Sequence, residues 1–162
     1  MVWLAAVLLA SVNTGSSGAC KLARDEARAE AGRDVAVLEK IVHLPIRPLE
    51  VWFKSLPRGV GGGPGPTDWT FVAVMRFDPK TLATFVKEGG LTEKGDPRFP
   101  RNEVAPWFPA PVTAALEPAS PTHMRVKGQR FDAAPFARGP GPPGSFFVLD
   151  EVPFVILRRP QD

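Results

Sequence analysis

The sequence predicts an α+β domain with a mainly antiparallel sheet of four to six strands and one amphipathic helix packed on one face of the sheet. Three observations lead to this fold class. Short segments with alternating apolar residues recur along the chain, as is typical of strands. One of these segments leads directly into a well-signalled helix. The 19 Pro and 15 Gly residues require many turns and argue against a helical bundle.

From its N-terminus the chain divides into an expected signal peptide over residues 1–19, a polar tether over 20–34 and a single domain over 35–162. Leu4 to Val12 is an apolar run followed by small and polar residues, which is typical of a secretory signal and too short to cross a bilayer. The alternative is a buried first strand or helix. Residues 21–31 are rich in Ala, Arg and Glu without a core-facing stripe, so we expect a solvated helix that ends at Gly32.

Cys20 is the only cysteine of the chain, which excludes an internal disulfide. The residues Ser17-Gly18-Ala19-Cys20 resemble the bacterial lipoprotein signal, although Ser17 stands where that signal usually has Leu and Met1 to Trp3 carry no Lys or Arg. The resemblance implies that Cys20 is the lipid-attachment residue and that a lipid holds the protein on a membrane outside the cytoplasm, in the periplasm or at the cell surface. Two alternatives stay open, namely a soluble secreted protein and a plain thiol.

The first segments of the domain are short. Residues 35–44 fit either a helix or a strand, whereas Leu49, Val51 and Phe53 alternate as on one face of a strand over 49–54. Residues 57–66 are rich in Pro and Gly and are expected to form an exposed loop. They do not match a phosphate-binding loop, because no Gly-Lys-Ser/Thr follows the glycines.

The clearest unit covers residues 69–90. Residues 69–77 alternate as a strand, and Asp78-Pro79 then favours a helix start, because Asp caps free N–H groups and Pro suits the first helical position. Leu82, Phe85 and Val86 would form its core-facing stripe. Gly89-Gly90 would end the helix.

Residues 91–111 are expected to form a long, proline-punctuated loop, of a kind that is often functional. Trp107 and Phe108 lie in it between two prolines, and they either pin the loop to the core or form a binding lip for a peptide, a glycan or an apolar ligand. Further strands are expected over 112–116, 122–131 and 145–158, with a Pro/Gly loop over 132–144 and a hairpin turn at Asp150-Glu151.

The charges and histidines suggest no catalytic residue, metal site or cofactor. His43 and His123 lack the spacing of metal ligands, and each is expected to be a structural or surface residue. The 20 basic and 17 acidic residues give a net charge of +3 spread along the chain, so nucleic acid is not an expected partner. The closest basic cluster, Arg125, Lys127 and Arg130, is expected to be a solvated surface.

Two functions from different classes remain. The first is a non-catalytic envelope protein that binds or supports an envelope protein or a glycan through Trp107, Phe108 and Trp69. The second is a small secreted or anchored hydrolase with dispersed carboxylates, for which Asp68 and Glu103 next to these tryptophans are the set to inspect. An exposed Trp107 would favour the first function, and a pocket with two carboxylates about 5–10 Å apart would favour the second.

Overall fold

Two antiparallel sheets organise the part of the chain that the computed structural model describes, residues 31–57, 69–139 and 144–161. Sheet A has the strand order β1-β2-β8-β7-β6, and sheet B has the order β3-β5-β4. The expected α+β class is confirmed, and the five strands of sheet A lie within the expected range. The strands are β1 (Glu50–Pro57), β2 (Trp69–Arg76), β3 (Arg98–Pro100), β4 (Leu116–Pro118), β5 (His123–Val126), β6 (Gly128–Asp132), β7 (Ser145–Leu149) and β8 (Phe154–Gln161).

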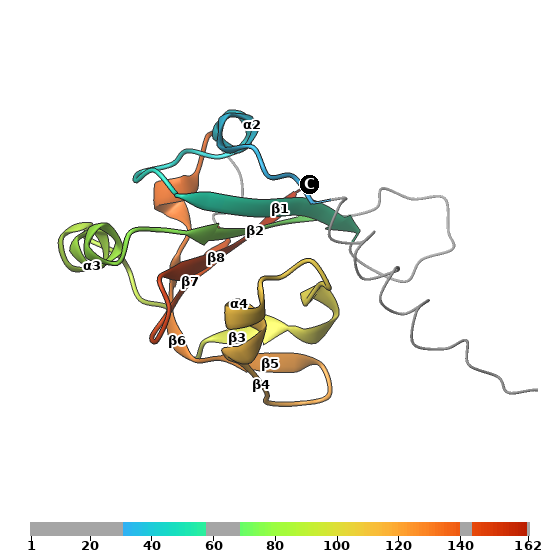
Figure 1. Cartoon of the computed structure of the whole chain (residues 1–162). Coiled ribbons are helices and arrows are strands. Elements are labelled where there is room, and N and C mark those ends of the chain that lie inside the picture. Colours follow the sequence, from blue (N-terminus) through green and yellow to red (C-terminus); the bar gives the residue numbers. More distant parts are fainter. Residues whose placement is uncertain (1–30, 58–68, 140–143, 162) are drawn as a thin grey trace, which may run out of the picture.

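Sheet A separates two hydrophobic clusters. Figure 1 shows helix α2 (Val35–Ile41) on one side of this sheet, and sheet B with helix α4 (Ala110–Ala114) on the other. Successive residues of a strand point to opposite faces, so Val155 and Leu157 enter the cluster beside α2, while Phe154 and Ile156 enter the cluster beside sheet B. The central strands are therefore apolar on both faces, which explains why Val72 and Val74 are as deeply buried as the residues between them.

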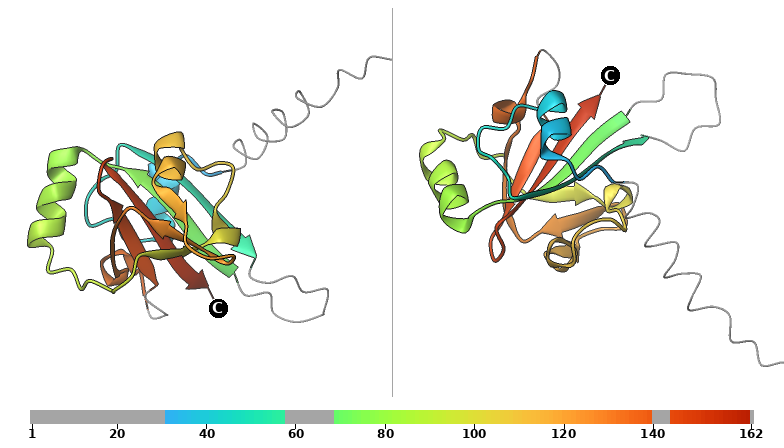
Figure 2. Two further views of the ribbon diagram at one scale, coloured as in Figure 1. Left: turned by 90° about the horizontal axis from the view of Figure 1, so that it is seen from below. Right: turned by 45° about the horizontal axis from the view of Figure 1, so that its top comes forward.

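Helix α3 (Pro79–Glu88) forms where the sequence predicts it. The Asp78 carboxylate accepts a hydrogen bond of 2.9 Å from the backbone N–H of Thr81, and Gly89 follows the last turn. Leu82 is buried in the cluster beside α2, and Phe85 and Val86 pack against it. Figure 2 shows the helix beyond one end of the strands of sheet A.

The segment 91–111 is not a structureless loop. The backbone N–H of Lys94 donates to the carbonyl of Arg130, and that of Asp132 donates to Thr92, so the segment first pairs with the outer edge of β6. It then forms β3 and the 3₁₀ turn η1 (Arg101–Glu103). Its backbone groups thus find partners, as buried segments require.

Two of the expected strands are wrong in detail. Residues 112–116 belong mostly to helix α4, because Pro109 precedes a short helical turn in which Pro111 needs no N–H donor. The expected strand over 122–131 is two strands, which separate at Lys127. There β5 leaves sheet B and β6 joins sheet A, and the Lys127 N–H donates to the carbonyl of Ala115.

The N-terminal boundary lies earlier than residue 35. Ala31 is 6% exposed, and Gly32 exchanges two backbone hydrogen bonds with Phe53 of β1, of 2.9 and 3.0 Å. Residues 31–34 of the expected tether therefore pack on the fold, and Asp34 caps α2. The expected signal peptide, Cys20 and most of the loop at 57–66 lie outside the described residues.

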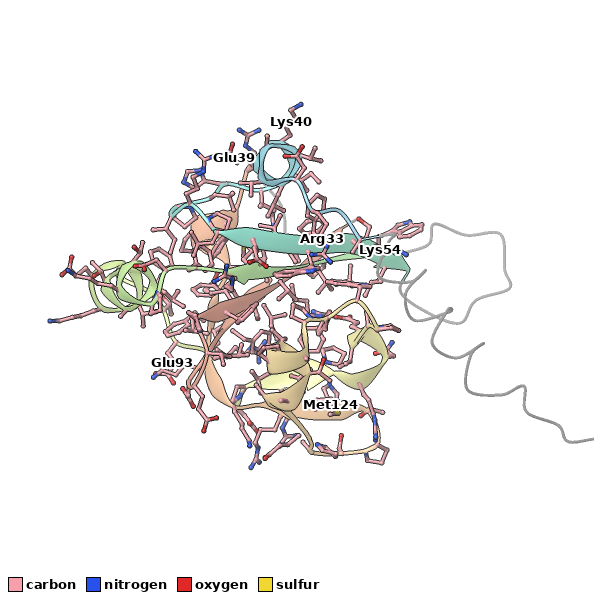
Figure 3. The ribbon with its side chains drawn as sticks, in the orientation of Figure 1. Arg33, Glu39, Lys40, Lys54, Glu93 and Met124 are labelled. Carbon is pink, nitrogen blue, oxygen red and sulfur yellow. The ribbon has the colours of Figure 1, made fainter. Side chains whose placement is uncertain are left out.

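Figure 3 shows Glu39 and Lys40 on the outer side of α2, where both are exposed.

Among the helices of the described residues, none has the length and apolar character that crossing a membrane requires. The 3₁₀ turn η2 (Ala134–Phe136) closes the cluster beside α2 by burying Phe136.

Candidate functional site: a basic pocket beside β6, β7 and β8

A pocket of about 700 Å³ opens beside the ends of β6, β7 and β8, on the face of sheet A that carries sheet B. Sheet A contributes one wall, with Arg130, Ser145, Phe147 and Arg158. The second wall comes from sheet B and the segment that leads into it. It contains Lys94, Gly95, Asp96, Arg98, Pro100 and His123. Four of these ten side chains are cations and one is a carboxylate.

Strand register sets the sheet A wall. Ser145 of β7 lies opposite Arg158 of β8, and Arg130 of β6 lies opposite Phe147 of β7. Because directly opposed residues in antiparallel strands share a face, all four side chains point to the side of sheet B. Arginines 28 residues apart in sequence thereby flank one serine.

Arg130 has no carboxylate partner among the described residues. Its Nε and Nη2 both donate to Ser145 Oγ, at 3.1 and 3.0 Å, and its guanidinium carbon lies 6.0 Å from the Phe147 ring centroid. An arginine has five N–H donors, so three of the Arg130 donors remain for another group. Since Ser145 Oγ accepts from Arg130, its own hydroxyl hydrogen is available to donate.

Arg158 is held by a bidentate ion pair. Its Nε and Nη2 donate to the two carboxylate oxygens of Glu103 at 2.6 and 2.7 Å, and the side chains are only 18% and 8% exposed. This planar two-bond geometry is the strong form of an ion pair. It fixes Arg158 at the pocket and joins η1 to the centre of sheet A.

The cations of the second wall form two further ion pairs, which are more exposed than Arg158–Glu103. Lys94 Nζ lies 2.6 Å from Asp132 Oδ2, and Arg98 Nε lies 2.6 Å from Asp96 Oδ2. The hydrogen bond from Lys94 holds the pKa of Asp132 below its ordinary value of 3.8. With these pairs and Arg158–Glu103 balanced, one positive charge remains in the pocket, that of Arg130.

Trp107 and Phe108 are buried, with 3% and 1% of their surfaces exposed. They are not a binding lip but pin the segment to the core, which was the other interpretation of this sequence. The Trp107 ring lies 4.7 Å from Phe108, which packs on Phe99, and Phe99 packs edge-on against Phe147 at 5.8 Å. The aromatic residues therefore support the pocket from behind, through Phe147.

Trp69 is 44% exposed at the start of β2 and does not line the pocket. The structure does not bring it together with Trp107 as one aromatic surface. Cys20 and Asp68 lie outside the described residues. Glu103, which the sequence analysis set beside Trp107 as a candidate carboxylate, is engaged with Arg158 instead.

The basic pocket does not offer the pair of carboxylates that a hydrolase of the expected kind requires. Asp96 is the only carboxylate that lines the basic pocket, and Arg98 holds it. No group of three or more His, Cys, Asp or Glu side chains within the described ranges could hold a metal ion. His43 is exposed, whereas His123 lines the pocket and its Nδ1 lies 2.9 Å from Thr122 Oγ1.

Sequence reasoning missed this pocket. Its cations lie at positions 94, 98, 130 and 158, with no local spacing that connects them. Arg130 stands in the cluster expected to be a solvated surface; Arg125 and Lys127 of that cluster are exposed, whereas Arg130 is half-buried. Lys127 pairs with Glu117 at 2.9 Å. The alternation in residues 128–132 was a usable signal, because it places Arg130 and Phe131 on opposite faces of one strand.

No protein-family model, no curated protein and no solved structure matches this chain, so the function has to be inferred from the chemistry of the pocket itself.

Proposed function

We propose that the chain is an exported, lipid-anchored, non-catalytic protein that binds a small oxyanion, a carboxylate or a phosphate, in the basic pocket. The observation that carries the proposal is Arg130. Its guanidinium is half-buried, it has no carboxylate partner among the described residues, and it lies in a pocket whose other cations are each paired.

A half-buried cation without a counter-charge loses part of its hydration and gains no ion pair in return. An oxyanion next to Arg130 supplies that charge. It can accept hydrogen bonds from the free N–H groups of the guanidinium and from the hydroxyl of Ser145. Such charge-assisted bonds are about twice as strong as neutral ones. Ser145 and Phe147 hold the guanidinium in place beforehand, which lowers the entropic cost of binding.

Titration calorimetry of the purified protein at low ionic strength, with inorganic phosphate and with acetate, tests this proposal. At least one of the two should bind, and Arg130→Gln should weaken its binding about tenfold or more, as expected for loss of charged hydrogen bonds. Arg138→Gln is the matched control. Arg138 is exposed, lies outside the pocket and makes one long hydrogen bond of 3.4 Å to the carbonyl of Lys40. Equal affinity of the Arg130 variant and the wild type would refute the proposal.

The location is proposed from the resemblance of Ser17-Gly18-Ala19-Cys20 to a lipoprotein signal. Metabolic labelling with a fatty-acid analogue, followed by membrane fractionation, compares the wild type with Cys20→Ala. Label that depends on Cys20 and follows the membranes supports the anchor. Unlabelled protein in the soluble exported fraction would instead indicate secretion.

A further inference from the structure

We infer that the ligand of the basic pocket is a small elongated dianion, with one anionic group at Arg130 and the other at Arg98 and Lys94. The inference rests on the proposed function and adds the chemical class of the ligand. It follows from the size of the pocket and from the placement of its cations.

The pocket is larger than one oxyanion requires. Its volume of about 700 Å³ lies in the range of roughly 300–1,000 Å³ that holds small organic ligands. A carboxylate or phosphate group bound at Arg130 fills only a small part of this space, and the rest of the ligand can occupy the remainder. The ligand therefore extends from Arg130 toward the second wall.

The second wall offers cations that can be released from their present partners. Arg98 and Asp96 are 54% and 43% exposed, and Lys94 and Asp132 are 39% and 20% exposed. Exposed ion pairs of this kind contribute little to stability. The Arg158–Glu103 pair is bidentate and mostly buried, so we expect it to stay closed. The second anionic group is thus expected at Arg98 and Lys94.

Asp96 raises one competing possibility, a zwitterion whose cationic group would take the place of Arg98. Four cations line the pocket and can bind two anionic groups, whereas Asp96 is the one lining carboxylate that could bind an ammonium group, so the lining favours the dianion over the zwitterion. A dianion also keeps Asp96 and Asp132 free to turn to solvent, where both are already partly exposed.

Three ligands with four carbon atoms separate the possibilities by calorimetry: succinate with two carboxylates, butyrate with one, and 4-aminobutyrate with one carboxylate and one ammonium. We expect succinate to bind about tenfold or more tightly than the other two, as expected for one additional charged contact. Pyrophosphate against phosphate repeats the comparison for phosphoryl groups, in case the pocket prefers them to carboxylates.

The double variant Asp96→Asn/Arg98→Gln removes both charges of the exposed pair and leaves the net charge unchanged. It should remove most of the advantage of the dianion over the matching monoanion, because only Lys94 then remains at the second anionic group. Asp96→Asn alone frees Arg98 and should strengthen succinate.

Equal affinities for the ligands with two and with one anionic group, or an advantage of two groups that is undiminished in the double variant, would overturn the inference while the proposed oxyanion site stands. Tightest binding of 4-aminobutyrate, lost in Asp96→Asn, would overturn it in favour of a zwitterion. Failure of every compound to bind would overturn the proposed function and the inference together.

Discussion

The ion pair between Glu103 and Arg158 gives the most direct test of how this fold holds its pocket. Glu103→Ala removes a carboxylate that is 8% exposed and that accepts two bonds, of 2.6 and 2.7 Å, from Arg158. The guanidinium of Arg158 would then remain, 18% exposed in the present structure, without its counter-charge.

The expected cost follows from burial. Breaking a buried ion pair by removing one partner costs about 3–5 kcal/mol, because the remaining charge stays uncompensated. Arg158 lines an open pocket, so water can replace part of the lost interaction, and we expect about 2–4 kcal/mol of lost unfolding free energy. Glu103→Gln keeps one acceptor oxygen and should cost less, about 1–2 kcal/mol.

Urea unfolding followed by tryptophan fluorescence measures these differences. Glu50→Ala is the matched control, because Glu50 and Arg76 are 48% and 37% exposed and should contribute about 1 kcal/mol or less. The double variant Glu103→Leu/Arg158→Leu should recover much of the loss, since apolar replacements of buried pairs are often neutral. If Glu103→Ala is no more destabilising than Glu50→Ala, the argument from burial is wrong.

Three further predictions concern other parts of the fold. Asp78→Ala should destabilise the domain and Asp78→Asn much less, because Asn also caps the N-terminus of α3; equal urea midpoints for the two variants would exclude the cap as the cause. Gly128→Ala should cost about 1–3 kcal/mol as an overpacking strain, because a Cβ there would lie 2.0 Å from the Val148 carbonyl oxygen, and thermal unfolding that matches the wild type would show that β6 can shift away. Lys94 lowers the pKa of Asp132, so this pair stabilises the fold above the ordinary carboxyl pKa of 3.8 and loses its effect as the pH falls through the lower pKa of the folded state. Between pH 7 and pH 3, Asp132→Asn should therefore lose less unfolding free energy than the wild type. Parallel pH profiles of the two proteins would contradict this assignment.

Local signals predicted the parts of the fold that depend on neighbouring residues. The alternation in β2 and the Asp78-Pro79 start of α3 are short-range features, and both are confirmed. The hairpin of β7 and β8 turns at residues 150–153, as the Asp150-Glu151 pair indicated. Helix α3 satisfies its own hydrogen bonds and its cap, and β7 pairs with β8, the next strand in sequence. The alternation that marks β2 is local too, although β2 pairs with the distant β8.

The remaining elements depend on tertiary contacts. Trp52 shares its strand face with Glu50 and Lys54 and would be expected on a solvent face. It is only 7% exposed, because its ring packs 6.1 Å from that of Phe154 and the Arg33 guanidinium lies over it at 4.8 Å. The break at Lys127 arises because two different sheets take up β5 and β6, and nothing in residues 122–131 marks that change. The basic pocket was missed for the same reason, since pairing of β6, β7 and β8 alone brings Arg130 and Arg158 to one serine.

Among the described residues, β8 is the last strand in sequence order and the middle strand of sheet A. Before residues 154–161 leave the ribosome, β2 and β7 each have an unpaired edge, and both hydrophobic clusters lack the side chains of Phe154 to Leu157. The native core therefore cannot form until β8 has been synthesised and has left the ribosome. For the proposed export route this order is useful, because a polypeptide threaded through a membrane channel has to stay unfolded until it has crossed.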